Sequence, residues 1–334
     1  MMSLKKNILI KSFICTKEIN NMKIGLMTPA FPELSLETIA KWSSENNFKT
    51  LEIACWPAGE GKDRKYGGVV HIDVDTLDNA KASEINGMLK DYGLEISALG
   101  YYPNPLHPDP SHREHVVNHL KKVISAAGML NVGIVGTFLG RSWNFEKCGR
   151  DWKKDLDYNF EEVKKTWPDI LSAAEDNNVK IAIEHCPMLW ADTWPGGSNL
   201  PHSPALLNRL FETLPNDSIG INLDPSHFVW QQIDYIRFID DFREKIFHVH
   251  AKDMAIDEEM FYQDGILGNG FRWQIPRLPG QGLIDWRELI SALYDAGYNY
   301  VLSIEHEDRN WEGTEELVKE GFLLARKALE IYTV

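Results

Sequence analysis

The stretch Val179-Lys-Ile-Ala-Ile-Glu-His-Cys186 is a short run of apolar and β-branched residues that ends in side chains able to act as acids, bases or metal ligands. From Met22 onward, such runs alternate with longer segments of helical periodicity, which is the pattern of βα units around a parallel sheet. The expected strands are residues 23–28, 50–55, 95–100, 132–138, 179–186, 218–223, 246–251 and 300–305. Eight strands with intervening helices predict an α/β fold, a single-domain (β/α)8 TIM barrel over residues 22–334.

Helix starts and long unassigned stretches are consistent with this barrel. Helices are expected to begin just after Ser35, Asp75, Pro110-Ser111, Pro204 and Asp285. The unassigned stretches 56–73, 139–155, 189–202 and 253–282 all follow strands, so we expect them to form loops at the C-terminal mouth of the barrel. A doubly wound open sheet is the alternative, but Thr28-Pro-Ala-Phe-Pro32 after the first strand lacks the glycines of a dinucleotide-binding turn.

The first 21 residues carry a different pattern. Lys5 and Lys6 precede a short apolar run, as at the start of a secretory signal, but Lys11 interrupts it too early. We therefore expect residues 1–21 to be a poorly ordered N-terminal extension. No stretch of the sequence approaches the roughly 20 apolar residues that a membrane-spanning helix needs.

The composition excludes several classes of protein. The chain has 334 residues, 43% hydrophobic and 25% charged, which is typical of a globular protein and not of a disordered one. A net charge of −14 disfavours binding to nucleic acid or anionic lipid. The four cysteines have no CxxC spacing, which indicates neither a zinc knuckle nor a disulfide framework, and we predict a cytoplasmic protein.

Side-chain alternation predicts which residues face the barrel axis. In Ile181-Ala-Ile-Glu184 the isoleucines face the helices, so Glu184 faces inward. The same reasoning places Asp224, His250 and Glu305 inward at the ends of their strands, with His248 two residues before His250. Isolated residues of these types are often salt-bridged or hydrogen-bonded, but four in matching register favour a common site.

Three buried carboxylates close together would repel one another unless a cation compensated their charge. A divalent metal held by Glu184, Asp224, His250 and Glu305 would resolve this conflict. Oxygen ligands with one imidazole suit Mn²⁺, Mg²⁺, Co²⁺ or Zn²⁺, and we predict Mn²⁺ as the cofactor.

Five motifs resemble those of the xylose isomerase-like barrels of sugar isomerases and epimerases, in particular the branch that includes tagatose 3-epimerase. They are Ile183-Glu-His-Cys-Pro187, Asn222-Leu-Asp-Pro-Ser-His227, His248-Val-His-Ala-Lys-Asp253, Arg277-Leu-Pro-Gly-Gln-Gly-Leu-Ile-Asp-Trp286 and Ser303-Ile-Glu-His-Glu-Asp308. The resemblance covers residues 23 to about 332. It implies that the enzyme is a metal-dependent sugar isomerase or epimerase that removes a proton next to a carbonyl through a metal-stabilised enediolate.

The resemblance also implies individual roles. Glu184 and Glu305 would be metal ligands and also the acid/base pair on opposite faces of the substrate. His227 matches a residue that contacts substrate hydroxyls beside the metal. Arg277 matches the arginine before a Pro-Gly stretch and would neutralise a developing enolate.

Further substrate contacts follow from position alone. Trp56 and Tyr101 lie just past strand ends, where aromatic rings can pack on a sugar; packing in the core is the alternative for both. His248 is either a hydrogen-bond partner of the metal site or a core histidine. Lys252 would reach a substrate oxygen or form a solvent-facing salt bridge with Asp253. Four loop tryptophans are further aromatic candidates: Trp190, Trp194, Trp273 and Trp311.

Other functions remain as alternatives. Similar barrels epimerise or cleave 3-keto-glycosides with the same metal site. AP endonucleases share the barrel but need an Asp-x-His pair after the seventh strand. None of Asp253, Asp257 and Asp264 has a histidine two positions later, so this pair is absent from the sequence there. A non-catalytic sugar-binding subunit would not require two glutamate bases. We expect a small-molecule sugar or keto-sugar substrate and, because of the exposed aromatics in the loops, a homodimer or homotetramer.

Overall fold

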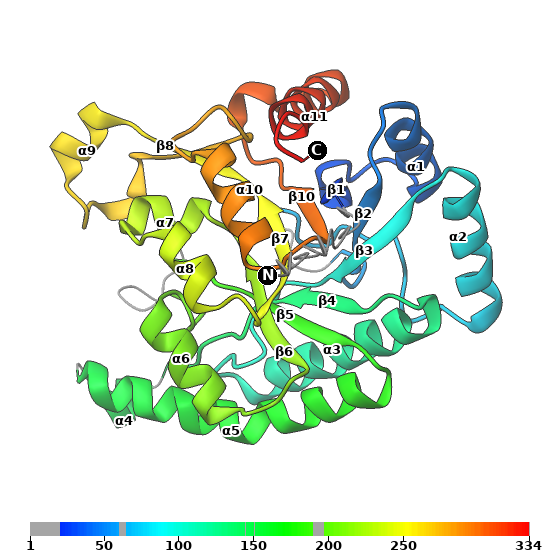
Figure 1. The fold of residues 1–334 in the computed structure, drawn as a ribbon. Helices are drawn as coiled ribbons and strands as arrows, with labels where there is room; N and C mark the ends of the chain where they lie inside the picture. Colours follow the sequence, from blue (N-terminus) through cyan, green and yellow to red (C-terminus); the bar gives the residue numbers. More distant parts are fainter. Residues whose placement is uncertain (1–20, 60–64, 144, 150, 190–196, 334) are drawn as a thin grey trace, which may run out of the picture.

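The computed structural model describes residues 21–59, 65–143, 145–149, 151–189 and 197–333, so the prediction for the N-terminal extension falls almost wholly outside the described residues. Eight parallel strands close a barrel in the order β1-β10-β7-β6-β5-β4-β3-β2 (Figure 1). They are β1 (Lys23–Met27), β2 (Thr50–Ala54), β3 (Glu95–Gly100), β4 (Ile134–Thr137), β5 (Lys180–Glu184), β6 (Ile219–Leu223), β7 (Ile246–Ala251) and β10 (Val301–Ile304). The predicted (β/α)8 barrel and its eight strands are confirmed.

Helices surround the barrel, and most begin where a capping side chain accepts a backbone hydrogen bond (Figure 1). They are α1 (Leu36–Glu45), α2 (Asn79–Asp91), α3 (Pro110–Leu130), α4 (Phe145–Cys148), α5 (Trp152–Asp176), α6 (Pro204–Thr213), α7 (Ser226–Gln231), α8 (Tyr235–Asp241), α9 (Glu258–Asp264), α10 (Trp286–Asp295) and α11 (Glu315–Glu330). Ser35 caps α1 and Asp285 caps α10, as predicted. The start expected at Asp75 is wrong: Asp73 holds Asp75 and Thr76 in a turn, and α2 begins three residues later after its cap Asp78.

The stretch 253–282, predicted to be a loop, contains two strands and a helix. Strands β8 (Asp253–Ile256) and β9 (Gln274–Arg277) pair in antiparallel register, and α9 belongs to the segment of chain that connects them (Figure 1). Sequence alternation did not reveal these strands because both are short and β9 contains Pro276, which is unusual within a strand. The hairpin follows β7 directly and carries the chain away from the barrel.

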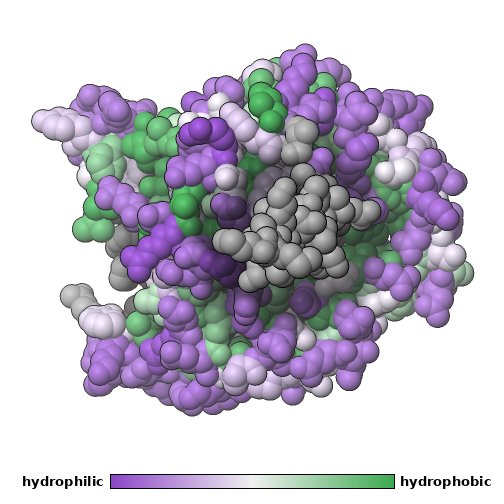
Figure 2. Space-filling model, in the orientation of Figure 1, coloured by the Kyte–Doolittle hydropathy of each residue, from purple (hydrophilic) through white to green (hydrophobic). Residues whose placement is uncertain are grey.

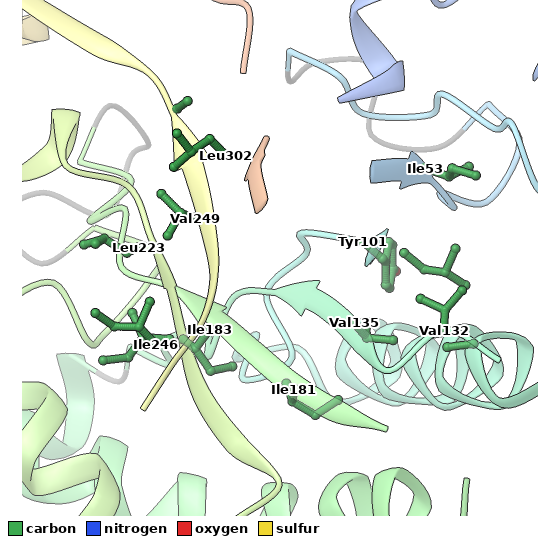
Figure 3. Close-up of a cluster of buried hydrophobic side chains, with 14 of the residues drawn as sticks. Ile53, Tyr101, Val132, Val135, Ile181, Ile183, Leu223, Ile246, Val249 and Leu302 are labelled. Atoms are coloured by element: carbon green, nitrogen blue, oxygen red, sulfur yellow. The ribbon is translucent and has the colours of Figure 1, made fainter. Parts of the chain in front are cut away.

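The core lies between the strands and the helices. Figure 3 shows the side chains of Ile181, Ile183, Leu223, Val249 and Leu302 on this outer side of the barrel, where they are buried. Their alternation with Glu184 and His250 agrees with the predicted register. Apolar packing outside the barrel therefore leaves the axis free for polar groups.

The face seen in Figure 2 is mostly hydrophilic around its outer rim, as expected for helices that present one polar side to water. Among the described residues, no helix combines the length and the apolar character needed to span a membrane.

Asp253 anchors the start of the β8–β9 hairpin. Its buried carboxylate accepts backbone hydrogen bonds from Met254 (2.8 Å), Gly280 (3.0 Å) and Ile284 (3.1 Å), and a side-chain bond from Trp286 (2.9 Å). We expect Asp253→Asn to lower the free energy of unfolding by about 2–3 kcal/mol, because the neutral amide accepts these bonds less well and can leave a donor unpaired. Urea unfolding measures the change, and a loss below about 0.5 kcal/mol would contradict it.

Candidate metal centre and active site

Four side chains predicted as ligands converge at the C-terminal mouth of the barrel. Glu184 ends β5, Asp224 follows β6, His250 lies on β7 and Glu305 follows β10. All four are buried, and one ligand atom from each lies within 4.8 Å of the others. The barrel thus gathers residues that span more than 120 positions of the sequence, from Glu184 to Glu305, as the inward register predicts.

The donor atoms of this cluster suit a divalent cation. His250 Nδ1 and Glu305 Oε2 are buried and have no hydrogen-bond partner among the described residues, and Asp224 Oδ2 is buried with ion-pair contacts to Lys252 and His227 alone. His250 Nδ1 is 3.1 Å from Glu305 Oε2 and 4.0 Å from Glu184 Oε2. Buried polar atoms that lack a hydrogen-bond partner are costly, and carboxylate oxygens with one imidazole match the ligand preferences of Mn²⁺, Mg²⁺ and Zn²⁺.

Lys252 is buried against the same cluster. Its Nζ lies 2.9 Å from Asp224 Oδ2, 3.0 Å from Glu305 Oε1 and 3.2 Å from Glu307 Oε2. The solvent-facing salt bridge with Asp253 considered from the sequence is therefore wrong, because Lys252 points into the barrel mouth. Burial lowers the pKa of Lys252, but the surrounding carboxylates outweigh it and hold the pKa well above its usual range.

His227, in the first turn of α7, lies beside two of the ligand carboxylates. Its Nε2 is 3.0 Å from Asp224 Oδ2 and 3.3 Å from Glu184 Oε1. Burial alone would lower the pKa of His227, but the neighbouring negative charge raises it well above its usual value. His227 also lines the cavity, so its position agrees with the predicted contact to substrate.

The two glutamates predicted as the acid/base pair have opposite pKa shifts. Burial raises the pKa of Glu184, and the charge of Glu305 adds to this effect. Burial acts on Glu305 in the same direction, but Lys252 and His250 outweigh it and lower the pKa of Glu305. Two carboxylates with different proton affinities are what acid and base roles require.

A second polar layer lies beneath the cluster and includes Glu52, which the sequence analysis missed. Glu52 Oε2 is 2.9 Å from His250 Nε2, and Glu52 Oε1 accepts a 2.5 Å hydrogen bond from Tyr102. Burial opposes ionisation, but His250 outweighs it and lowers the pKa of Glu52 to about 2. Strand alternation could have found Glu52, since Leu51 and Ile53 face outward on β2.

His248 belongs to this layer. Its Nδ1 lies 3.1 Å from Asn222 Oδ1 and its Nε2 lies 3.4 Å from Ser97 Oγ. Burial lowers its pKa to about 4, so the ring is neutral at pH 7. His248 is not among the described residues that line the cavity, so the alternative of a hydrogen-bonded interior histidine matches its position better than a substrate contact.

A cavity of about 740 Å³ opens over the cluster. Its polar lining includes Glu52, Glu184, Glu305, His227 and Lys252. Aromatic and apolar side chains also line it: Met27, Trp56, Tyr66, Tyr101, Tyr102, Phe138 and Trp143. Trp56 and Tyr101 both belong to this lining, with their rings edge-to-face at 5.0 Å, but Tyr101 is 2% exposed and packs in the apolar core, which matches the alternative of core packing.

Other predicted contacts lie elsewhere. Arg277 forms an ion pair with Asp308 at 3.0 Å and is not among the described residues that line the cavity. Trp273 is buried in a separate apolar cluster, and Trp311 packs against the core. Trp190 and Trp194 lie outside the described residues. The sequence could not locate Arg277, because its place depends on the β8–β9 hairpin.

His306 follows Glu305, one of the predicted ligands, but is not part of the cluster. It lies edge-to-face with Phe322 at 5.2 Å, and burial lowers its pKa to about 4. In the unfolded chain its pKa is about 6.5, so the unfolded state binds a proton first as the pH falls. The stability that neutral His306 contributes is therefore complete above pH 6.5 and is lost as the pH falls towards 4.

We expect His306→Phe to flatten this pH dependence. The free energy of unfolding of the variant should fall less steeply between pH 6.5 and 4.5, by up to about 1.4 kcal/mol per pH unit, because one fewer proton is taken up on unfolding. Urea titrations at several pH values, with chelator present, measure the slopes. Equal slopes for both proteins would contradict the prediction.

Comparisons with known proteins agree with the fold. A family model described as xylose isomerase-like TIM barrel matches residues 40–328. The uncharacterized protein YfiH of Bacillus subtilis is 26% identical over 311 residues, which cover 86% of this chain and 93% of that protein. Further matches carry the names inosose dehydratase, inosose isomerase and 3-keto-D-glucoside 4-epimerase.

Two solved structures share the fold. D-psicose 3-epimerase of Clostridium cellulolyticum H10 has a TM-score of 0.66 and 17% identity, and the match covers 93% of this chain and 99% of the other. The IOLI protein with a bound zinc atom has a TM-score of 0.65 and 17% identity, with 93% and 99% covered. Because the family model spans most of the chain, the protein belongs to the xylose isomerase-like TIM barrel family.

Proposed function

We propose that the protein is a divalent-metal-dependent isomerase or epimerase of sugars or keto-sugars. The observation that carries the proposal is that Glu184 and Glu305 line one cavity beside Asp224 and His250. In the barrel, β7 and β6 separate β10 from β5, so the two glutamates approach the cavity from different sides. A base and an acid in that arrangement can act on the two faces of a single carbon.

The proposed reaction needs groups that transfer protons and groups that bind the substrate. One glutamate removes the proton from the carbon next to a carbonyl, and the other delivers a proton to the opposite face. A bound cation would polarise the carbonyl and stabilise the negative charge that develops. Lys252 and His227 line the cavity within 3.5 Å of each other and would hold substrate oxygens by hydrogen bonds.

The residues Glu184, Asp224, His250 and Glu305 would hold the cation, for which we propose Mn²⁺. Oxygen-rich ligation suits Mn²⁺, and the single imidazole also permits Zn²⁺ or Co²⁺. A bound zinc atom is named in one structure of the same fold, which supports testing for a metal in this protein. Metal analysis of the protein purified without chelator identifies the ion.

A 3-keto-glycoside is the second candidate substrate. The cavity volume of about 740 Å³ lies in the upper part of the usual range of about 300–1,000 Å³ for small-molecule sites. It extends from the glutamates to Trp143 and His107, which leaves room beyond one sugar ring. One structural neighbour is named as a 3-keto-D-glucoside 4-epimerase, which supports testing this class.

Hydrogen exchange tests the proposal. The protein is incubated in D₂O with Mn²⁺ and with free ketoses or 3-keto-glycosides, and NMR follows deuterium at the carbon next to the carbonyl. We expect exchange with at least one class of substrate, no exchange after chelation, and loss of exchange for at least one epimer in Glu184→Gln. No exchange with any substrate, or exchange unaffected by the Glu184→Gln substitution, would contradict the proposal.

A further inference from the structure

We propose that Glu52 is a positioning residue of the metal centre, because it fixes His250 in the ring form that can bind a cation through Nδ1. The inference rests on the proposed function in assigning a metal to the cluster. It concerns a residue outside that cluster, on β2 rather than on β5, β6, β7 or β10. Glu52 does not replace any of the four ligands.

The geometry of Glu52 is constrained from several sides. Its side chain is 1% exposed, and its two oxygens contact groups from three other parts of the barrel. Oε2 lies 2.9 Å from His250 Nε2 and accepts a 3.1 Å hydrogen bond from Ser303. Oε1 accepts the hydrogen bond from Tyr102. A carboxylate held in this way has one orientation available.

The room for this arrangement comes from Gly136 on β4. A Cβ at Gly136 would lie 2.2 Å from the Tyr102 hydroxyl, and a Cβ at Gly100 would lie 3.1 Å from Glu52 Oε1. Two small residues on neighbouring strands therefore leave space for the carboxylate and the phenol. The interior of the barrel is shaped around Glu52 and Tyr102.

The position of Glu52 decides which nitrogen of His250 is free. A neutral imidazole carries one N–H, and an ionised carboxylate can only accept a hydrogen bond. Glu52 therefore favours the hydrogen on Nε2, which leaves the lone pair of Nδ1 directed at the ligand cluster. Nδ1 is one of the buried atoms without a hydrogen-bond partner in the described structure. A carboxylate behind a metal-binding histidine is a common means of fixing ring orientation and increasing ligand basicity.

Asn222 offers the competing arrangement. Its side-chain amide nitrogen lies 2.9 Å from His250 Nε2 and 3.1 Å from Tyr102 Oη. If that nitrogen donates to Nε2, the ring hydrogen must move to Nδ1, where it blocks metal binding. With the hydrogen on Nε2, the amide of Asn222 would be turned over relative to this arrangement, so that its oxygen faces His250 Nε2 and its nitrogen donates to His248 Nδ1. Glu52 thus selects between two hydrogen-bond patterns.

The test compares Glu52→Gln with wild type in the full chain. Calorimetry measures the affinity for Mn²⁺, and the visible spectrum of the Co²⁺ form reports the ligand geometry. The matched control is Asp253→Asn, which removes a buried carboxylate that contacts none of the four ligands in the described structure. We expect Glu52→Gln to weaken Mn²⁺ binding about 10–100-fold and to change the Co²⁺ spectrum, whereas Asp253→Asn loses stability but keeps wild-type affinity.

Two further variants keep the inference falsifiable. Tyr102→Phe removes one partner of Glu52 and should weaken Mn²⁺ binding less than Glu52→Gln does, and Glu52→Asp should recover part of the affinity. If Glu52→Gln does not fold, the Tyr102→Phe and Glu52→Asp results decide the question. Wild-type affinity and an unchanged Co²⁺ spectrum in the folded Glu52 and Tyr102 variants would overturn the inference and leave the proposed function standing. Failure of the wild-type protein to bind Mn²⁺, Co²⁺ or Zn²⁺ would overturn both.

Discussion

Glu184→Gln and Glu305→Gln are each expected to lower the rate of sugar interconversion by about 10²–10⁴-fold, the usual contribution of a positioned acid or base. The amide cannot accept a proton at neutral pH, yet it keeps the shape of the side chain. Both residues are also proposed metal ligands, so the rates are compared at Mn²⁺ concentrations that saturate each variant. Bound metal is measured in the same samples.

Deuterium exchange separates the two roles further. If each glutamate serves one face of the carbon, a variant that lacks one base should still exchange the hydrogen of one epimer while failing to exchange that of the other. The two variants should show opposite preferences. Loss of both exchange reactions in both variants, with metal still bound, would contradict the assignment of one base to each face.

Glu162→Gln is the matched control for these substitutions. Glu162 is a largely buried carboxylate on α5 that pairs with Arg113 at 2.5 Å, outside the cavity over the ligands. Its substitution should cost stability but leave the rate per folded molecule unchanged. A rate loss in Glu162→Gln as large as that in Glu305→Gln would indicate that the assay measures unfolding.

The convergence of the four proposed ligands could be predicted because two simple regularities coincide. The alternation of side chains along a strand decides which of them face the barrel axis, and the C-terminal ends of the parallel strands meet at one mouth of the barrel. Glu184 and His250 lie on strands with outward-facing isoleucine or valine neighbours, so their direction follows from local sequence. Their mutual distance then follows from closure of the barrel.

The polar layer beneath the ligands is less accessible to such reasoning. Glu52 faces inward by the same alternation, but its contact with His250 depends on how β2 and β7 approach each other across the barrel. These strands are not neighbours in the sheet, and their residues are almost 200 positions apart. The face of Glu52 was predictable, and its partner was not.

Side chains beyond the strand ends are harder still to place. Lys252 follows a strand whose register is clear, yet its long side chain bends back to three carboxylates instead of pairing with the adjacent Asp253. Arg277 is positioned by the β8–β9 hairpin, whose antiparallel pairing has no strong local signal. The motif in which a residue lies does not determine its distance from the site when such irregular segments intervene.

Lys252→Met should destabilise the metal-free protein by about 3–5 kcal/mol, the usual cost of removing one partner from a buried ion pair. Lys252 is 2% exposed and contacts Asp224, Glu305 and Glu307, so methionine leaves these carboxylates without its compensating charge. Urea unfolding in the presence of chelator measures the loss. Lys122→Met is the matched control, because Lys122 forms an exposed pair with Asp75, and pairs of that kind contribute about 0–1 kcal/mol.

The response to Mn²⁺ distinguishes a charge role of Lys252 from simple packing. A divalent cation among the same carboxylates would supply the positive charge that methionine lacks, and the variant would no longer place an ammonium group near that cation. Mn²⁺ should therefore bind more tightly to Lys252→Met than to wild type and should reduce the difference in stability between them. The difference for Lys122→Met should not depend on Mn²⁺. A stability loss in Lys252→Met that is the same with chelator and with saturating Mn²⁺ would mean that the ammonium group and the cation do not share the charge of one cluster.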